Sequence, residues 1–339
     1  LWHPTDTDKS NWAYWHTDTG LNGGTARSYH AAYAHKNKMY VLGGQTDASP
    51  GGVTTVEVAD IEPDGTLSAW TTTGMQALPD VRHGHDVHVY NDTMYLVGGN
   101  SNGTLRDTVY YSRLNDDGTM NAWVQTDSFG SARSSQGGIM SAIWGGYLYI
   151  AGGCTAINGS GYCTTISQDV QLASINKDGS LSSWRTIDGL QNERVGYTLV
   201  AWQEGLYRIG GCLSQEAVSG DCESTSADVD YGVINDDGDV STATSSSPSG
   251  SGNCSGGDPY GCDLPTPGDD AGEIGHTMSA SAVENGYLYV IGGCTDYTCS
   301  GSFPEANSAS GNIAYVQVDA DGTLRSPSVC SGTTYGAWC

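Results

Sequence analysis

The sequence predicts an all-β fold of the β-propeller class, and two observations support this prediction. First, a tyrosine, two further residues and a Gly-Gly pair recur five times, with the first glycine at positions 43, 98, 152, 210 and 292. Second, no segment keeps a helical period, whereas short runs of β-branched and aromatic residues alternate with Gly, Asn and Asp. Repeats of about 50 residues that each contain four short strands are typical of a β-propeller.

The four strands of a repeat can be placed in order in the second repeat. They are expected over residues 85–90, 93–98, 108–115 and 121–126, with tight turns at Asn91-Asp92 and Asp117-Gly118. Asp-Gly between two strand-like runs favours a hairpin, because Gly accepts a positive φ. The Gly-Gly pair is interpreted as the end of the second strand, where neighbouring sheets crowd and a Cβ would clash.

The chain is expected to form one propeller domain over residues 1–339. The blades are placed at about 21–73, 74–126, 127–187, 188–272 and 273–325, with an insert at 241–270 and a tail at 326–339. A strand at 12–17, similar to Ser68-Ala69-Trp70, is expected to complete the last blade and close a ring of five. The alternatives are a fragment of a larger propeller and a ring that a partner chain completes.

These repeats resemble those of the kelch family over residues from about 12 to 325. The resemblance rests on the Gly-Gly pairs, on Trp70, Trp123 and Trp184 after the Asp-Gly turns, and on an Arg-x-x-His element before the second strand. This element is complete in the first two repeats, whereas the third and fourth have Gln136 and Tyr197 in place of His and the fifth has Glu273 in place of Arg. It implies a β-propeller of kelch type. Kelch propellers usually have six or seven blades, whereas five repeats are visible here.

Charge and hydropathy exclude two classes of partner. The formal net charge of -25 would repel a phosphate backbone, so nucleic-acid binding is not expected. No stretch approaches the ~20 apolar residues that a transmembrane helix needs, so no membrane span is expected.

The ten cysteines indicate an oxidising compartment, either extracellular or at the cell surface. In chain order they form five close pairs with separations of 5–10 residues, and pairing of neighbours is one of many connectivities: Cys154 with Cys163, Cys212 with Cys222, Cys254 with Cys262, Cys294 with Cys299, and Cys330 with Cys339. Four Asn-x-Ser/Thr sequons are candidates for glycosylation, at Asn91, Asn102, Asn158 and Asn253.

Strand order assigns all the long loops to one end of the propeller, and binding is expected there. The Arg-x-x-His elements open on the same face near the axis and give a candidate ring of binding residues: Arg27, His30, Arg82, His85, Arg133, Arg194, Tyr197, Glu273 and His276. One interpretation is an anion or sugar-carboxylate pocket. The other is structural, with the arginines bracing adjacent blades and the histidines hydrogen-bonded on the innermost strands.

Enzyme chemistry has less support in the sequence. No cofactor or metal is expected, because the cysteine spacing does not suit zinc and the Asp-rich turns fit hairpins better than calcium loops, with calcium as the alternative. A glycosidase would need two axial carboxylates, for which the inner strands offer mainly Asp86 and Glu273.

The leading hypothesis is a non-catalytic extracellular or cell-surface module that binds a glycan or a protein through its loop face. One alternative is a structural module of a surface appendage that associates with itself through a blade edge or its termini. A second alternative, implied by the kelch resemblance, is a sugar mutarotase or a copper oxidase.

Overall fold

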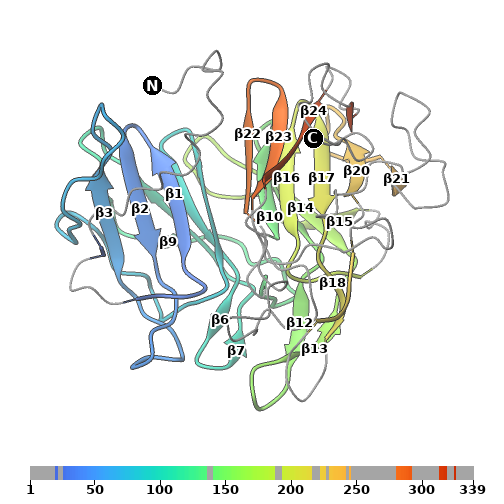
Figure 1. The fold of residues 1–339 in the computed structure, drawn as a ribbon, viewed down its shortest axis with the longest axis horizontal. Helices are drawn as coiled ribbons and strands as arrows, with labels where there is room; N and C mark the ends of the chain where they lie inside the picture. Colours follow the sequence, from blue (N-terminus) through green and yellow to red (C-terminus); the bar gives the residue numbers. More distant parts are fainter. Residues whose placement is uncertain are drawn as a thin grey trace.

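The computed structural model describes residues 20–21, 26–135, 140–187, 193–215, 222–226, 229–241, 244–245, 280–291, 313–318 and 324–325. Their regular structure is entirely β-strand and forms five sheets and three two-stranded hairpins (Figure 1). The expectation of an all-β chain is confirmed for these residues. The following predicted features lie outside them: the strand at 12–17, most of the insert, the tail, Glu273, His276, Asn253 and the last six cysteines.

Three central sheets each have four antiparallel strands in chain order. The second sheet contains β4 (Asp86–Tyr90), β5 (Thr93–Val97), β8 (Val109–Arg113) and β9 (Val124–Gln125). The third contains β10 (Ser141–Trp144), β11 (Tyr147–Ala151), β14 (Val170–Ser174) and β15 (Arg185–Ile187). The fourth contains β16 (Thr198–Trp202), β17 (Gly205–Ile209), β20 (Val229–Val233) and β21 (Thr244–Ser245).

The first and last sheets have less complete outer edges. The first contains β1 (Ala31–His35), β2 (Lys38–Leu42) and β3 (Val56–Asp60). An isolated β-bridge between Val58 and Thr71 lies where the other sheets have their fourth, outer strand. The fifth contains β22 (Ala280–Glu284), β23 (Tyr287–Ile291), β24 (Ile313–Val318) and β25 (Leu324–Arg325). Because β25 pairs only with the last two residues of β24, the described residues give the rest of this outer edge no partner.

The hydrophobic core lies between consecutive sheets. Leu42 of the first sheet packs in one cluster with Met94 of the second, and Val97 of the second packs in another with Leu148 of the third. Two further clusters join the third sheet to the fourth and the fourth to the fifth. The innermost strands β1, β4, β10, β16 and β22 therefore follow one another around a common axis.

The Gly-Gly pairs occur where neighbouring sheets approach closely. Gly43 and Gly44 have φ values of 58° and 91°, which other residues rarely adopt. A Cβ on Gly43 would lie 2.5 Å from the carbonyl oxygen of Arg82, which belongs to the next repeat. The interpretation of Gly-Gly as a strand end beside a crowded neighbour is confirmed at this position.

Tyrosines in the second strands of the first three sheets join each of these sheets to the next one through what we call the tyrosine clamps. In each clamp the phenol donates a hydrogen bond of 2.9–3.0 Å to the glycine carbonyl of an Asp-Gly turn: Tyr40 to Gly118, Tyr95 to Gly179, and Tyr149 to Gly238. The aspartate of such a turn bonds within its own hairpin. Asp117, for example, accepts from the backbone and hydroxyl of Thr119.

The loops after the second strands contain hairpins that gather at one end of the sheets, which we call the loop face (Figure 1). They are β6 (Asn100–Ser101) with β7 (Thr104–Leu105), β12 (Cys154–Ile157) with β13 (Cys163–Ile166), and β18 (Cys212–Gln215) with β19 (Cys222–Thr225). Disulfides Cys154–Cys163 and Cys212–Cys222 close two of them, which confirms two of the five predicted pairs. No helix in the described part of the chain is suited to span a membrane.

Candidate functional site

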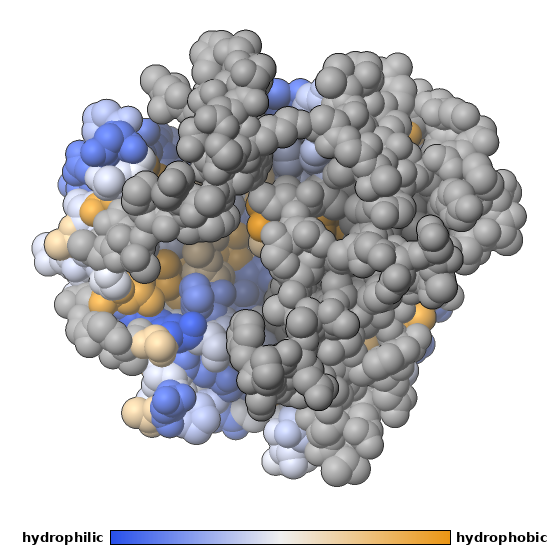
Figure 2. All heavy atoms as spheres, viewed as in Figure 1, coloured by the Kyte–Doolittle hydropathy of each residue, from blue (hydrophilic) through white to orange (hydrophobic). Residues whose placement is uncertain are grey.

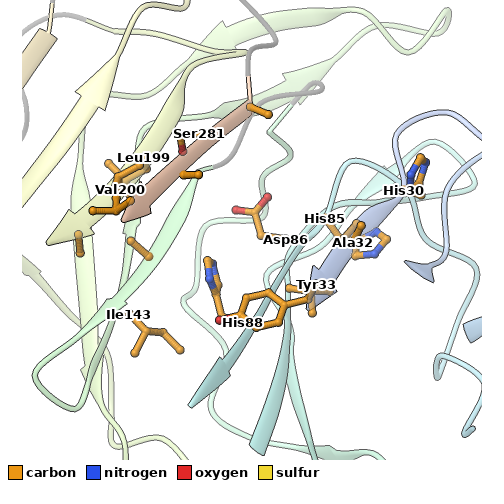
Figure 3. A pocket seen from close by; sticks show the side chains of 17 residues that line it. His30, Ala32, Tyr33, His85, Asp86, His88, Ile143, Leu199, Val200 and Ser281 are labelled. Carbon is orange, nitrogen blue, oxygen red and sulfur yellow. The ribbon is translucent and has the colours of Figure 1, made fainter. Parts of the chain in front are cut away.

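The innermost strands of all five sheets line one cavity of about 500 Å³. Most of its lining is small or aliphatic, including Ala32, Ile143, Leu199 and Val200 (Figure 3). His30 lines the cavity next to the loop face and is exposed, so the cavity is open to solvent there. Figure 2 shows hydrophilic residues over much of the described surface, with apolar residues visible mainly in a recess between them. We call the cavity that the five innermost strands line the axial cavity.

Asp86, at the start of β4, places a carboxyl group in this cavity (Figure 3). One carboxylate oxygen accepts hydrogen bonds from the backbone N–H of Met140 (2.8 Å) and from the hydroxyl of Ser141 (2.7 Å). Burial raises the pKa of Asp86 to about 7, against the opposing effect of these two hydrogen bonds. This carboxyl group therefore exchanges its proton near neutral pH.

His88 extends the network, because its Nε2 lies 2.8 Å from the Ser141 hydroxyl oxygen. Since that hydroxyl donates to Asp86, the imidazole acts as the donor to Ser141. The serine thus lies between the carboxylate and the histidine, whereas a nucleophilic triad places the histidine in the middle. This order positions the carboxylate of Asp86 and does not activate the serine.

The histidines predicted at the axis fall into two environments. His30 lies at the mouth of the axial cavity with part of its surface open to solvent, and the partial burial of its ring, followed by the charge of Arg27, lowers its pKa. His85 is buried against the Gly-Gly of the first repeat, and burial followed by Arg82 lowers its pKa to about 3. Both side chains are therefore neutral at pH 7.

A chain of backbone hydrogen bonds runs along the mouth of the cavity through the first four repeats. It joins residues two positions after each repeat's arginine: Gly84 N–H donates to Tyr29 (2.9 Å), Ser135 to Gly84 (3.3 Å), and Gly196 to Ser135 (3.1 Å). We call it the axial hydrogen-bond chain. Gly84 and Gly196 have positive φ values of 56° and 67°, which suit glycine.

Tyr29 occupies this position in the first repeat with φ 53°, where an aromatic residue is strained. Its side chain is 43% exposed, the ring of His83 lies 6.2 Å away, and His83 in turn contacts the Gln45 amide at 3.2 Å. The first repeat thus presents an aromatic ring where two of the others have glycine.

The predicted arginines are directed into the protein. Arg82, Arg133 and Arg194 are fully buried, and each donates to the carbonyl of the first glycine of its own Gly-Gly pair at 2.8–3.1 Å. Each also pairs with a carboxylate, as Arg27 does with Glu57: Arg82 with Asp80, Arg133 with Asp169, and Arg194 with Asp230. All of these partners belong to the arginine's own repeat, so the contacts hold each repeat together internally and do not bridge adjacent blades as one interpretation expected. The arginines do not line the axial cavity.

Tyr197 is also buried and belongs to the core between the third and fourth sheets, so only His30 and His85 of the described candidates reach the axial cavity. Sequence reasoning missed Tyr29, His88 and Ser141. The sequence did contain a signal for Tyr29, since aligning the repeats places it at the position that Gly84 and Gly196 occupy in two other repeats. Ser141 had none, because its contact with Asp86 depends on how β10 of the third sheet packs against β4 of the second.

Three sequons lie at turns. Asn91 is in the β4–β5 turn, Asn102 is at the tip of the β6–β7 hairpin, and Asn158 is at the tip of the β12–β13 hairpin. Asn91 and Asn102 are exposed, whereas Asn158 is half-buried and accepts bonds from the backbones of Ser160 and Tyr162. Their glycosylation stays a prediction.

Five sheets that follow one another about an axis define an all-β propeller, and the comparisons agree with this class. YjhT, a kelch-type β-propeller of known structure, superposes with a TM-score of 0.58 at 14% identity, over 89% of this chain and 84% of that one. A likeness at this identity concerns the fold alone.

One sequence relative, Alpha-scruin of Limulus polyphemus, a kelch-repeat protein, is 28% identical over 133 residues. The match covers 39% of this chain and only 14% of the relative's length. No protein-family model matches the chain. Together the two similarities support a kelch-like fold.

Proposed function

We propose that this chain is a non-catalytic recognition module, extracellular or on the cell surface, that binds a glycan through its loop face around Tyr29. The observation that supports this most directly is the conformation of Tyr29, an exposed aromatic at a left-handed position where Gly84 and Gly196 stand in other repeats. A strained residue of this kind is retained where the surrounding structure holds it, and such residues concentrate at ligand sites.

The chemistry around Tyr29 suits a sugar. An aromatic ring offers an apolar face for stacking at low entropic cost, and His83 and Gln45 add polar groups beside it. The loop face is also rigid, because disulfides close two of its hairpins and the axial hydrogen-bond chain holds the backbone under Tyr29. Rigidity lowers the entropy that binding has to overcome.

The location and the ring complete this proposal. Two disulfides favour an oxidising compartment, which agrees with a secreted or surface-displayed protein. The proposed ring has five blades, and the strand expected at 12–17 pairs with β24 along its outer edge, where β25 leaves residues 313–316 without a described partner.

The experiment compares Tyr29→Gly and Tyr29→Ala with the wild type on a glycan array. Both variants are expected to lose binding at least tenfold, because both remove the ring. Glycine relieves the left-handed strain that alanine keeps, so Tyr29→Gly is expected to be about 1 kcal/mol more stable than Tyr29→Ala in urea denaturation.

Val124→Ala provides the control, since Val124 is another exposed apolar residue, on β9 away from the loop face. It should leave glycan binding unchanged. A wild type that binds no glycan, or Tyr29 variants that bind as well as the wild type, would overturn the proposal.

A further inference from the structure

The axial cavity presents one carboxyl group among mainly small and aliphatic side chains. Asp86 is only 5% exposed, yet it lines the same cavity as Ala32, which is exposed to solvent (Figure 3). Its hydrogen bonds from Met140 and Ser141 are 2.8 Å and 2.7 Å long and both end on Oδ2. The carboxyl group is thus held in place by the wall of the cavity.

The groups around Asp86 supply no positive charge near pH 7. On its own strand, burial lowers the pKa of His85 to about 3 and that of His88 to about 4. From β1 the titratable groups are Tyr33 and His30, and the pKa of His30 is lowered. Next to β16, burial raises the pKa of the Tyr197 phenol. The linings from β10 and β22 contain no titratable side chain among the described residues.

A carboxylate that is held by hydrogen bonds but lacks a cationic neighbour is complementary to a positively charged ligand. We infer that the axial cavity is a binding site for a small organic cation with a primary ammonium group, which pairs with the carboxylate of Asp86. This site is separate from the glycan surface around Tyr29 and does not depend on it.

The size and lining of the cavity restrict the ligand further. A volume of about 500 Å³ lies within the range of small-molecule sites. An ammonium group donates three hydrogen bonds, and the aliphatic side chains of Leu199 and Val200 provide contacts for a hydrocarbon portion. A bare metal ion fits less well, because no cluster of metal-binding side chains exists within the described residues.

The probe pair is cyclohexylammonium and its neutral analogue cyclohexanol, titrated calorimetrically into the full chain at pH 8. The ammonium compound is expected to bind at least tenfold more tightly. Its affinity is expected to fall about tenfold between pH 8 and pH 6, because Asp86 with a pKa of about 7 must then release a proton on binding.

Two variants test the assignment. Asp86→Asn keeps the shape and is expected to abolish the preference for the ammonium compound. Ala32→Leu narrows the cavity from β1 and removes neither hydrogen-bond donor of Asp86, so it is expected to weaken the binding of both compounds at least tenfold. Val124→Ala is the control, because Val124 lies on β9 outside the lining of the cavity, and it should leave cyclohexylammonium binding unchanged.

Equal affinities for the two probes, unchanged binding by Asp86→Asn, or competition by sodium ions at equimolar concentration would each overturn the inference. The glycan proposal fails on a different result, the loss of array binding by the wild type, so the two outcomes can be distinguished.

Discussion

Asp86 and Tyr29 both occupy positions that cost the folded state stability. Asp86 buries a carboxyl group at the axis, and Tyr29 holds a left-handed backbone at the mouth of the axial cavity. The spacing of the Arg-x-x-His elements is enough to find the residues near the axis. It does not tell which side chains line the cavity, because the arginines point away from it to the Gly-Gly carbonyls whereas His30 contributes to its lining.

The cost of burying Asp86 predicts a definite pH dependence. Its folded-state pKa of about 7 is above the unfolded value of about 3.9, so the folded protein holds the extra proton between these pH values. Binding of this extra proton raises the free energy of unfolding. The gain is present in full below pH 4 and is lost as the pH rises to 7.

Relative to Asp86→Asn, the wild type should therefore lose stability at a rate on the order of 1 kcal/mol per pH unit across this window. Urea denaturation of both proteins at four pH values between 4.5 and 7.5 measures the difference. A difference that does not change with pH would contradict the assignment of a raised pKa to Asp86.

At the scale of the element, the strands of the second repeat agree with the sequence to within about one residue for β4, β5 and the start of β8. The fourth strand was expected over 121–126, but β9 has only two residues, because an exposed outer strand is paired on one side alone. The hairpins of the loop face were not predicted as strands. Their Gly-, Ser- and Thr-rich segments lack the apolar alternation that identifies a strand.

The tyrosine clamps give a prediction at this scale. Tyr95→Phe removes the hydroxyl that bonds to the Gly179 carbonyl and leaves that buried acceptor without its donor. The expected loss is about 1–2 kcal/mol of unfolding free energy. Chemical denaturation measures it, and Tyr162→Phe, a half-buried tyrosine on the β12–β13 hairpin, should change stability by less than about 0.5 kcal/mol. Equal effects of the two substitutions would argue against the clamp.

At the scale of the whole molecule, the sequence repeats predict the order of the five sheets that the described residues form, because each repeat contains one meander and one Gly-Gly pair. The axial cavity could not be predicted in this way. It results from the small side chains that five separate strands bring together at the axis, and no local sequence pattern indicates which strands will be neighbours there.

Closure of the ring is tested by deletion of residues 1–20, with deletion of residues 1–10 as the control that keeps the expected strand at 12–17. The longer deletion should lower the melting temperature by several degrees and expose the edge of β24 to pairing with another copy. Differential scanning calorimetry and light scattering measure both effects. A shortened monomer with the wild-type melting temperature would show that this strand does not close the ring.

The tyrosine clamps also bear on the synthesis of the protein. Each one reaches forward in the chain by 78 to 89 residues. During translation at roughly 5–20 residues per second, a newly made sheet therefore has no acceptor for its tyrosine for about 4 to 18 s. Throughout that delay the apolar side of the sheet that faces its successor is uncovered, so each nascent repeat depends on the next one to bury it.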